Sequence, residues 1–442
     1  MKTCFLIVGL AAGMAANLNA GETLRLKLEP ERDYVLSGSP QELTVKIDLT
    51  AGAKKHKRTP LNLAVILDRS GSMSGAKIEK ARQAAMGLVD QLFPGDIFSL
   101  VTYSDSTEVV LRAQEVEDKE ALKRRISRIQ SGGSTALYAG VQSGAEQIAR
   151  HFSDKRINRI ILLSDGLANV GPSSPRELRN LGRSLSEKGI AVTTIGVGDD
   201  YNEELMAGLA EASDANYYYV KDTEKLPEIF AKELGELLTV AARDVKIEII
   251  CPEGVRPIGL IGRPERFENQ KAQVRLSHLT MAQNRYVFLR CRVEKEKPEI
   301  ALVNMTYRDE LNGGSEETVS DTARIRFTND RDRAASSLKS EVVAQKELLL
   351  AAIAKDEALA EADAGRYQQA AQKLSQQAVV LDNQYRNAPA SLQPTLRLEI
   401  DNLRQQANDL ENNRYGAGMR KALQNEAWMG RNSKSYSSGS NH

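Results

Sequence analysis

Residues Leu61–Gly75 read LNLAVILDRSGSMSG, an unbroken apolar run followed by a loop rich in hydroxyl groups. A short apolar run bounded by turn residues is typical of a buried strand. The loop that follows carries one carboxylate, that of Asp68, and the hydroxyls of Ser70 and Ser72. The stretch therefore predicts a strand that ends in a cluster of oxygen-bearing side chains.

The segment from 61 to 240 continues this pattern. Helical segments such as AKIEKARQAAMGLVDQLF and EKLPEIFAKELGELLTV alternate with the apolar runs DIFSLVTY, NRIILLS, AVTTIGVG and NYYYV. Strands that alternate with helices predict a mainly parallel sheet that is covered on both faces. We therefore expect an α/β domain with a doubly wound, mainly parallel sheet, in which ligands bind beyond the carboxyl ends of the strands.

Strand-like patterns lie on both sides of this segment. Residues 23–50 contain two period-two stretches, and four further candidate strands lie between 244 and 327. Two strands alone do not form a stable domain, so the N-terminal pair needs the sheet that the later strands provide. The sequence therefore predicts a β-sandwich into which the α/β domain is inserted.

Past residue 328 the composition turns to Ala, Gln, Glu, Leu and Arg, and strand signals vanish. Three amphipathic helices are expected here, the first from about 338 to 364, and they form a helical hairpin or bundle. The expected organisation is a signal peptide at 1–20, sandwich strands at 21–58, the α/β domain at 61–240, the rest of the sandwich at 241–328, a helical region at 335–425 and a disordered tail at 426–442.

The N-terminus has the features of a secretory signal peptide, because Lys2 precedes an apolar stretch and a run of small residues that ends at Ala20. No later window approaches the length needed to span a bilayer. We therefore expect an exported protein, periplasmic, extracellular or at the cell surface, with no transmembrane segment in the mature chain. The 60 Lys and Arg residues nearly balance the 59 Asp and Glu residues, so no global field attracts nucleic acid.

Two cysteines, Cys251 and Cys291, lie in strand-like runs at positions that share a face with apolar residues. In an oxidising compartment this arrangement allows one disulfide. Two small, buried thiols fit the same pattern equally well, because geometry cannot be derived from spacing. The sequence leaves both alternatives open.

Several kinds of chemistry are excluded for the loop after Leu67. It lacks the G-x-x-x-x-G-K-[ST] run of a phosphate-binding loop, and Met73 stands where a hydrolase elbow needs its nucleophilic serine. The chain has four histidines, none at the spacing of a zinc pair or a catalytic triad. A site for a hard cation remains, because such ions prefer oxygen ligands.

Two further strand ends carry suitable oxygens. Ser134 and Thr135 follow paired glycines in SGGSTALYAG, and Asp165 closes the apolar run in LLSDGLANVG. Because the carboxyl ends of parallel strands lie at one edge of a sheet, three loops can bring Asp68, Asp165 and a hydroxyl together. The combination is far more specific than the polar turn alone.

These residues resemble the metal-ion-dependent adhesion site of von Willebrand factor type A domains. Asp68, Ser70 and Ser72 match the D-x-S-x-S motif of that family, Asp165 matches its third-loop aspartate, and the spacing favours Thr135 over Ser134 as the second-loop threonine. The signal peptide, split sandwich and C-terminal helices resemble secreted bacterial proteins of this superfamily, which are similar to inter-alpha-trypsin inhibitor heavy chains and calcium-activated chloride channel accessory proteins.

The resemblance implies that the five residues hold Mg²⁺, with Mn²⁺ or Ca²⁺ as alternatives, and that an exposed Asp or Glu of a partner protein completes the coordination. It implies protein binding, in adhesion or envelope assembly, and not an enzyme. Two alternatives stay open: a structural scaffold whose metal only stabilises the loops, and a metal-dependent hydrolase, for which Asp105 and Glu79 are the nearby acidic candidates.

Overall fold

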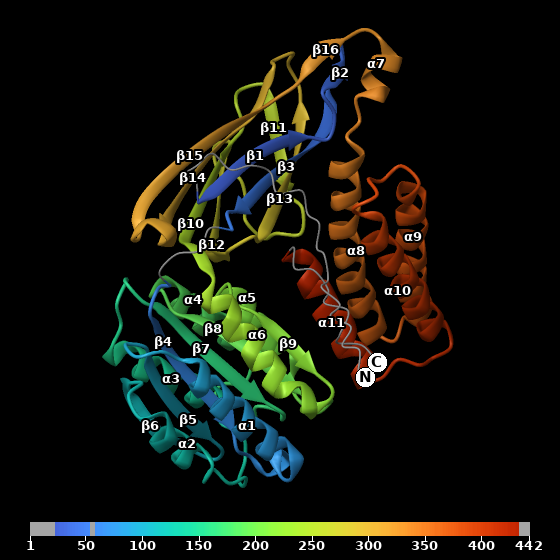
Figure 1. The fold of residues 1–442 in the computed structure, drawn as a ribbon. Helices are drawn as coiled ribbons and strands as arrows, with labels where there is room; N and C mark the ends of the chain where they lie inside the picture. The colour runs from blue at the N-terminus through green and yellow to red at the C-terminus, as the bar shows by residue number, and fades with distance from the viewer. Residues whose placement is uncertain (1–22, 54–57, 433–442) are drawn as a thin grey trace, which may run out of the picture.

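The computed structural model describes residues 23–53 and 58–432, which form a β-sandwich, an α/β domain and a helical bundle (Figure 1). The expected signal peptide at 1–20 lies outside the described residues. Within the described ranges, no helix is long and apolar enough to cross a bilayer. The α/β domain lies below the sandwich in Figure 1, and the helical bundle lies beside both.

The α/β domain has one six-stranded sheet in the order β6-β5-β4-β7-β8-β9. All neighbours are parallel except β5 and β6, so the predicted mainly parallel sheet is confirmed. Its strands are β4 (Leu61–Asp68), β5 (Ile97–Tyr103), β6 (Thr107–Glu115), β7 (Ile157–Ser164), β8 (Ala191–Val197) and β9 (Tyr217–Val220).

Helices cover both faces of this sheet, which explains the unbroken apolar run in β4. All eight residues of β4 are buried. Leu63 and Val65 pack with helices of one layer, and Ala64 and Ile66 pack with helices of the other. The first layer contains α1 (Ala76–Gln91), α2 (Lys119–Ile126) and α6 (Leu226–Leu238); the second contains α3 (Leu137–Arg150), α4 (Pro175–Glu187) and α5 (Glu203–Ala212).

The sandwich consists of two four-stranded sheets. One has the order β1-β3-β13-β11, with β1 (Leu24–Pro30), β3 (Gln41–Ala51), β13 (Asn284–Val293) and β11 (Val255–Leu260). The other has the order β12-β10-β14-β15, with β12 (Lys271–Thr280), β10 (Val240–Ile250), β14 (Glu299–Asp309) and β15 (Ser315–Arg324). Strand β3 pairs with β13 along its length, so the two halves of the sandwich join across the insert. A short parallel pair, β2 (Tyr34–Leu36) with β16 (Arg326–Thr328), extends the sandwich.

Cys251 and Cys291 are both buried in the sandwich core, and in the structure both are free thiols. Cys291 lies in β13, and Cys251 directly follows β10. Burial raises the pKa of each thiol from 9.0 to about 12. These free thiols correspond to the second of the two alternatives that the sequence left open.

The C-terminal part is helical, as predicted, but it contains more helices than expected. Helices α8 (Ser340–Asp363), α9 (Tyr367–Tyr385) and α10 (Gln393–Glu411) correspond to the three predicted ones, and α7 (Arg331–Ser336) precedes them. A further helix, α11 (Ala417–Arg431), occupies residues assigned in part to a disordered tail from 426. The remaining tail residues, 433–442, lie outside the described residues.

Helix α11 packs against α8 of the helical bundle and also against the α/β domain. Its Trp428 is buried and meets the ring of Tyr217 in β9 edge to face, with the ring centroids 6.3 Å apart. Glu203, at the start of α5, pairs with Arg420 and accepts a hydrogen bond of 2.9 Å from Lys421 Nζ. These tertiary contacts stabilise a segment whose two glycines disfavour a helix, although most of its other residues are good helix formers.

Candidate functional site

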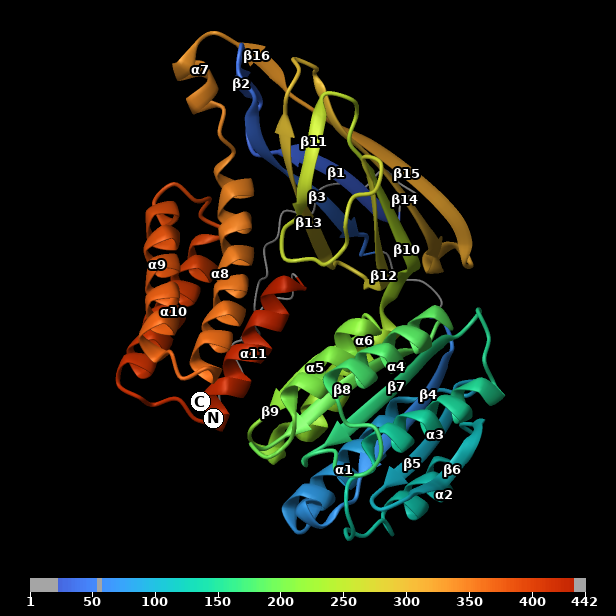
Figure 2. The same cartoon turned by 180° about the vertical axis from the view of Figure 1, so that it is seen from behind.

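The five predicted site residues lie on three loops at the carboxyl edge of the sheet, the edge opposite to the sandwich (Figure 2). Asp68 ends β4, and Ser70 and Ser72 lie at the short helix η1 (Gly71–Met73) that follows. Thr135 lies two residues before α3, and Asp165 directly follows β7. Because β4 and β7 are adjacent and parallel, their ends bring the two aspartates to one place.

Four of the five residues share one hydrogen-bond network. Asp68 Oδ1 accepts the backbone N–H of Ser70 at 2.8 Å. The hydroxyls of Ser70 and Ser72 are 3.0 Å apart, and Ser72 Oγ donates to Asp165 Oδ1 at 2.8 Å. The first and third loops therefore present their oxygens to one another.

Thr135 completes the group from the second loop. A methyl group placed on Gly166 would lie 3.3 Å from Ser72 Oγ and 3.4 Å from Thr135 Oγ1, so both hydroxyls border the same point. The backbone N–H of Thr135 donates to Asn169 Oδ1 at 2.8 Å. These contacts fix the second loop against the third.

Ser134, the other hydroxyl of this loop, has a different environment. Its backbone N–H donates to Asp105 Oδ1 at 2.9 Å. Gly133 has a φ of +88°, and a Cβ there would lie 2.4 Å from Asp105 Oδ2, so the paired glycines permit this close approach. The contacts of Ser134 lie toward Asp105, which agrees with the choice of Thr135 as the site hydroxyl.

The electrostatics of the group favour a cation. Asp68 and Asp165 are both fully buried. Burial raises the pKa of Asp68, and the neighbouring charge of Asp165 raises it further. Among the described residues, the ammonium that contacts the group is that of Lys77, whose Nζ lies 2.6 Å from Asp165 Oδ2. Two carboxylates with three hydroxyls form an all-oxygen donor set that suits Mg²⁺, Mn²⁺ or Ca²⁺.

Lys77 and Ser164 belong to the site but were not predicted. Ser164 Oγ donates to Asp68 Oδ2 at 2.9 Å. Ser164 directly precedes Asp165, so the S-D-G run contained a signal for it; Lys77 lies in the first turn of α1, where its pairing with Asp165 has no sequence signature. Ser164 thus fixes the second carboxylate oxygen of Asp68 by a hydrogen bond.

Other arrangements of metal ligands are absent from the described part of the chain. No group of three or more His, Cys, Asp or Glu side chains there is placed to hold a metal. Asp105 and Glu79, the acidic candidates for a hydrolase, are exposed, and Asp105 is engaged by Ser134. The residues singled out from the sequence thus lie together in the structure, in the hydroxyl-rich group at the end of β4.

Comparison with known proteins identifies the fold that carries this site. Residues 62–232 match the family model of the von Willebrand factor type A domain. This part of the chain is a von Willebrand factor type A (VWA) domain. The match covers the sheet from β4 to β9 and all three loops of the candidate site, and it confirms the resemblance to von Willebrand factor type A domains.

Relatives in sequence include proteins from bacteria and from mammals. An uncharacterized protein from Synechocystis sp. is 28% identical over 63% of this chain and 69% of its own length. The uncharacterized protein YfbK from Escherichia coli is 29% identical over 55% of this chain and 43% of its own length. Inter alpha-trypsin inhibitor, heavy chain 4, from Mus musculus is 27% identical over 42% of this chain. The chain spans less than half of YfbK and 22% of the mouse protein.

Two solved structures share the fold over almost the whole chain. A von Willebrand factor type A protein from Catenulispora acidiphila has a TM-score of 0.72 at 17% identity and covers 93% of this chain and 98% of its own. The ArnB paralog VWA2 from Sulfolobus acidocaldarius has a TM-score of 0.64 at 18% identity, with coverage of 93% and 99%. The arrangement of VWA domain, sandwich and C-terminal helices is therefore shared with other proteins.

Proposed function

We propose that this chain is an exported, metal-dependent protein-binding protein. A Mg²⁺ ion held by Asp68, Ser70, Ser72, Thr135 and Asp165 accepts an Asp or Glu side chain of a partner protein as its last ligand. The observation that carries this proposal is the meeting of two buried carboxylates and three hydroxyls, with one ammonium as the neighbouring positive charge.

The ligand types explain why such a site binds a partner. Neutral hydroxyls donate less charge to a divalent cation than carboxylates do, so a cation with few carboxylate ligands keeps affinity for another anion. The site lies at the outer edge of the sheet, where Ser72 is exposed. A carboxylate that reaches in from another molecule would find its charge compensated by the metal.

A binding role is supported over a catalytic one by the surroundings of the site. A hydrolase needs a base within hydrogen-bond reach of the attacking water. Both acidic candidates from the sequence, Asp105 and Glu79, are exposed, and Asp105 accepts a hydrogen bond from the loop backbone. The proposal of export rests on the N-terminal sequence alone.

The first test measures metal binding by isothermal titration calorimetry with Mg²⁺, and with Mn²⁺ and Ca²⁺ for comparison. We expect binding to the wild type and to Asp200→Ala, which removes an exposed carboxylate from the loop after β8. We expect its loss in Asp68→Ala and a marked weakening in Thr135→Val, which keeps the shape of the side chain. Unchanged affinity in both site variants, with native circular dichroism, contradicts the assignment.

The second test measures partner binding by pull-down with wild type and Thr135→Val, each with Mg²⁺ and with EDTA. Recovery of partners by the wild type with Mg²⁺ alone supports recognition through the metal. Recovery of the same partners under all four conditions contradicts it. Loss of the native circular dichroism spectrum in EDTA favours the scaffold alternative, in which the metal stabilises the loops.

A further inference from the structure

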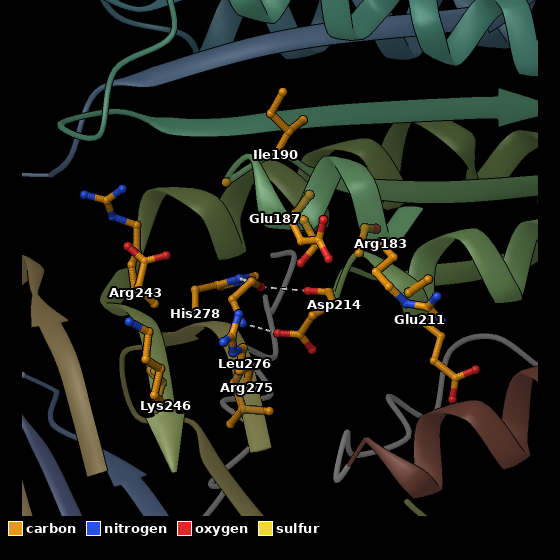
Figure 3. Close-up of a pocket in the computed structure, with 18 of the residues that line it drawn as sticks. Arg183, Glu187, Ile190, Glu211, Asp214, Arg243, Lys246, Arg275, Leu276 and His278 are labelled. Carbon is orange, nitrogen blue, oxygen red and sulfur yellow. Dashed lines mark hydrogen bonds between the residues drawn. The ribbon is translucent and has the colours of Figure 1, made fainter. Parts of the chain in front are cut away.

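A large cavity lies between the three parts of the molecule, far from the metal site. Its volume is about 1460 Å³, and its walls come from the VWA domain, the sandwich and the end of α11 (Figure 3). The VWA wall includes Arg159 near the start of β7 and the loop that leads into β8. The cavity thus lies at the amino ends of the parallel strands, whereas the metal site lies at their carboxyl ends.

The charge of this cavity differs from that of the chain as a whole. Its lining contains ten Arg and Lys residues and six Asp and Glu residues, although the complete chain carries a net charge of only +1. Eight of the ten basic residues are arginines, whose planar guanidinium groups bind carboxylates in a bidentate manner. Six of the ten form ion pairs with carboxylates of the protein, so the preference for an anionic ligand comes from the other four: Arg183, Lys188, Lys246 and Arg275.

Two of these basic side chains face each other, and neither positive charge is paired with a carboxylate of the described residues. Lys246 of β10 lies directly opposite Arg275 of β12 in the antiparallel register, on the outer face of the sandwich. Neither forms an ion pair with a described residue, and Arg275 reaches only the amide oxygen of Gln273 at 3.4 Å. Like charges directly opposite on one face destabilise a sheet, so an anion that binds between them relieves a cost.

On the same sheet, a second pair of basic residues also faces each other, but each of their charges is paired with a carboxylate. Arg243 of β10 lies opposite Arg308 of β14, but each is neutralised within the protein. Arg243 contacts Glu310 at 2.7 Å, and Arg308 contacts Asp154 at 3.1 Å. Lys246 and Arg275 have no equivalent carboxylates, although they stand in the same sheet and in the same kind of register.

The wall opposite these two residues is also basic. Arg183 of α4 and Lys188, just after that helix, line the cavity, and neither forms an ion pair with a described residue. In Figure 3 Arg183 lies across the cavity from Lys246. Arg159 is buried in the wall, with 1% of its surface exposed, and its Nε has no hydrogen-bond partner among the described residues. Its other nitrogens contact Thr193 and the ring of His278, and one of them lies 3.9 Å from the buried carboxylate of Glu233.

We propose that this cavity binds an acidic peptide segment of a partner protein, with Lys246 and Arg275 as the central contacts. The volume exceeds the range of about 300–1,000 Å³ that is usual for small-molecule pockets, so a polypeptide segment fits it better. The six acidic residues in the lining repel a uniformly charged polyphosphate or nucleic acid, whereas a peptide can place neutral or basic residues beside them.

The test uses fluorescence anisotropy with the full chain and a fluorescein-labelled peptide in which glutamate alternates with glycine, at about 0.1 M salt, where the Debye length is about 10 Å. All titrations contain EDTA, so that the metal site does not contribute, and Asp68→Ala serves as a second safeguard. We expect the wild type and Asp68→Ala to bind alike. The double variant Lys246→Gln with Arg275→Gln should weaken binding about tenfold or more, because it removes both central charges.

The matched control is Lys297→Gln with Arg386→Gln, which removes the same two charges from exposed positions outside the cavity. It should leave the affinity within about twofold of the wild type, since distant surface charges are screened. Equal weakening in both double variants overturns the proposal, as does the absence of binding to the wild type. Binding of tripolyphosphate, but not of the peptide, with the same dependence on Lys246 and Arg275 overturns the assignment of the ligand class.

Discussion

Single side chains in the sandwich core govern the reactivity of the molecule toward thiol reagents. Cys251 and Cys291 are 2% and 0% exposed, and burial raises the pKa of both to about 12. The thiolate is the reactive form of cysteine, and a pKa this high leaves almost none of it at neutral pH. The two thiols are therefore protected from thiol reagents for two reasons: they are inaccessible, and they stay protonated.

We predict that a Cys4→Ser variant of the full chain shows no rapid labelling by a thiol-reactive chromophore at pH 8. The same variant should label at two thiols after unfolding in denaturant without reductant, because Cys251 and Cys291 are then exposed. Labelling at no thiol after unfolding would mean that a disulfide forms, contrary to the structure.

The raised pKa values also give a pH dependence of stability. The unfolded thiols lose their protons near pH 9 and the folded ones near pH 12, so the unfolded state holds fewer protons in between. The contribution of the two cysteines is fully present below pH 9 and is lost as the pH rises toward 12. Denaturant unfolding of wild type and Cys251→Ala at pH 8 and pH 11 should show a smaller pH-dependent loss of free energy in the variant.

At this scale the sequence indicated the candidate site residues but not the side chains that pair with them. Asp68, Ser70 and Ser72 could be predicted because they lie at a strand end and in the short loop that follows, which keeps their oxygens close together. The pairing of Lys77 with Asp165 could not, since it depends on the direction of one long side chain across two loops. Whether two inward-facing cysteines form a bond was undetermined for the same reason.

Helix α11 shows how far an element can depend on its neighbours. The carboxylate of Glu203 forms ion pairs with both Arg420 and Lys421. Glu203 is 4% exposed and Lys421 is 3% exposed. Burial and the charge of Arg420 lower the pKa of Lys421, so its ammonium depends on the carboxylate of Glu203. Removal of that carboxylate leaves a buried cation without its counter-charge.

We predict that Glu203→Gln lowers the free energy of unfolding by about 3–5 kcal/mol, as expected when one partner of a buried ion pair is lost. It should also shift the emission of Trp428 to longer wavelength, because the chain has only one tryptophan and it packs at this interface. Chemical unfolding followed by tryptophan fluorescence measures both effects.

The matched control is the next residue, Glu204, whose side chain is about half exposed and lies 3.7 Å from Arg179. Glu204→Gln should change stability by at most about 1 kcal/mol, as is usual for surface ion pairs. If the two variants behave alike, Glu203 does not hold α11 against the VWA domain.

The sequence predicted some elements much better than others. Strand β4 could be predicted because burial on both faces requires an unbroken apolar run, and that run is visible locally. Helix α11 could not, because its buried Trp428 packs on Tyr217, which is more than two hundred residues away in the chain. The composition of α11 favours a helix, but the surfaces that bury its face come from distant parts of the chain.

The whole molecule is built as a domain inserted into another at neighbouring points. The carbonyl of Gly52 accepts the N–H of Ala282 at 3.1 Å, and that of Thr239 accepts the N–H of Met281 at 2.7 Å. Because residues 281 and 282 are adjacent, the two ends of the insert lie close together on the same turn. The sandwich is therefore continuous without the VWA domain.

We predict that replacement of residues 53–238 by a short Gly-Ser linker yields a chain that retains the β-sandwich. Its far-ultraviolet circular dichroism should show sheet and helix, and its thermal unfolding should stay cooperative. Trp428 should emit at longer wavelength, since β9 and α5 are gone. Loss of any cooperative transition would mean that the sandwich needs the VWA domain as a folding partner.

The pairing of β3 with β13 also sets an order of events during synthesis. Val45 lies opposite Leu289, so the N-terminal strands emerge from the ribosome long before their neighbour does. The complete VWA sheet, residues 61–220, is available in the meantime, and domains fold as units as they emerge. The VWA domain thus becomes compact first. Until β13 is synthesised, β3 has an unpaired edge, and such an edge favours aggregation. Helix α11 covers the side of β9 and α5 last, so a ribosome that stalls before residue 417 releases a VWA domain with that side uncovered.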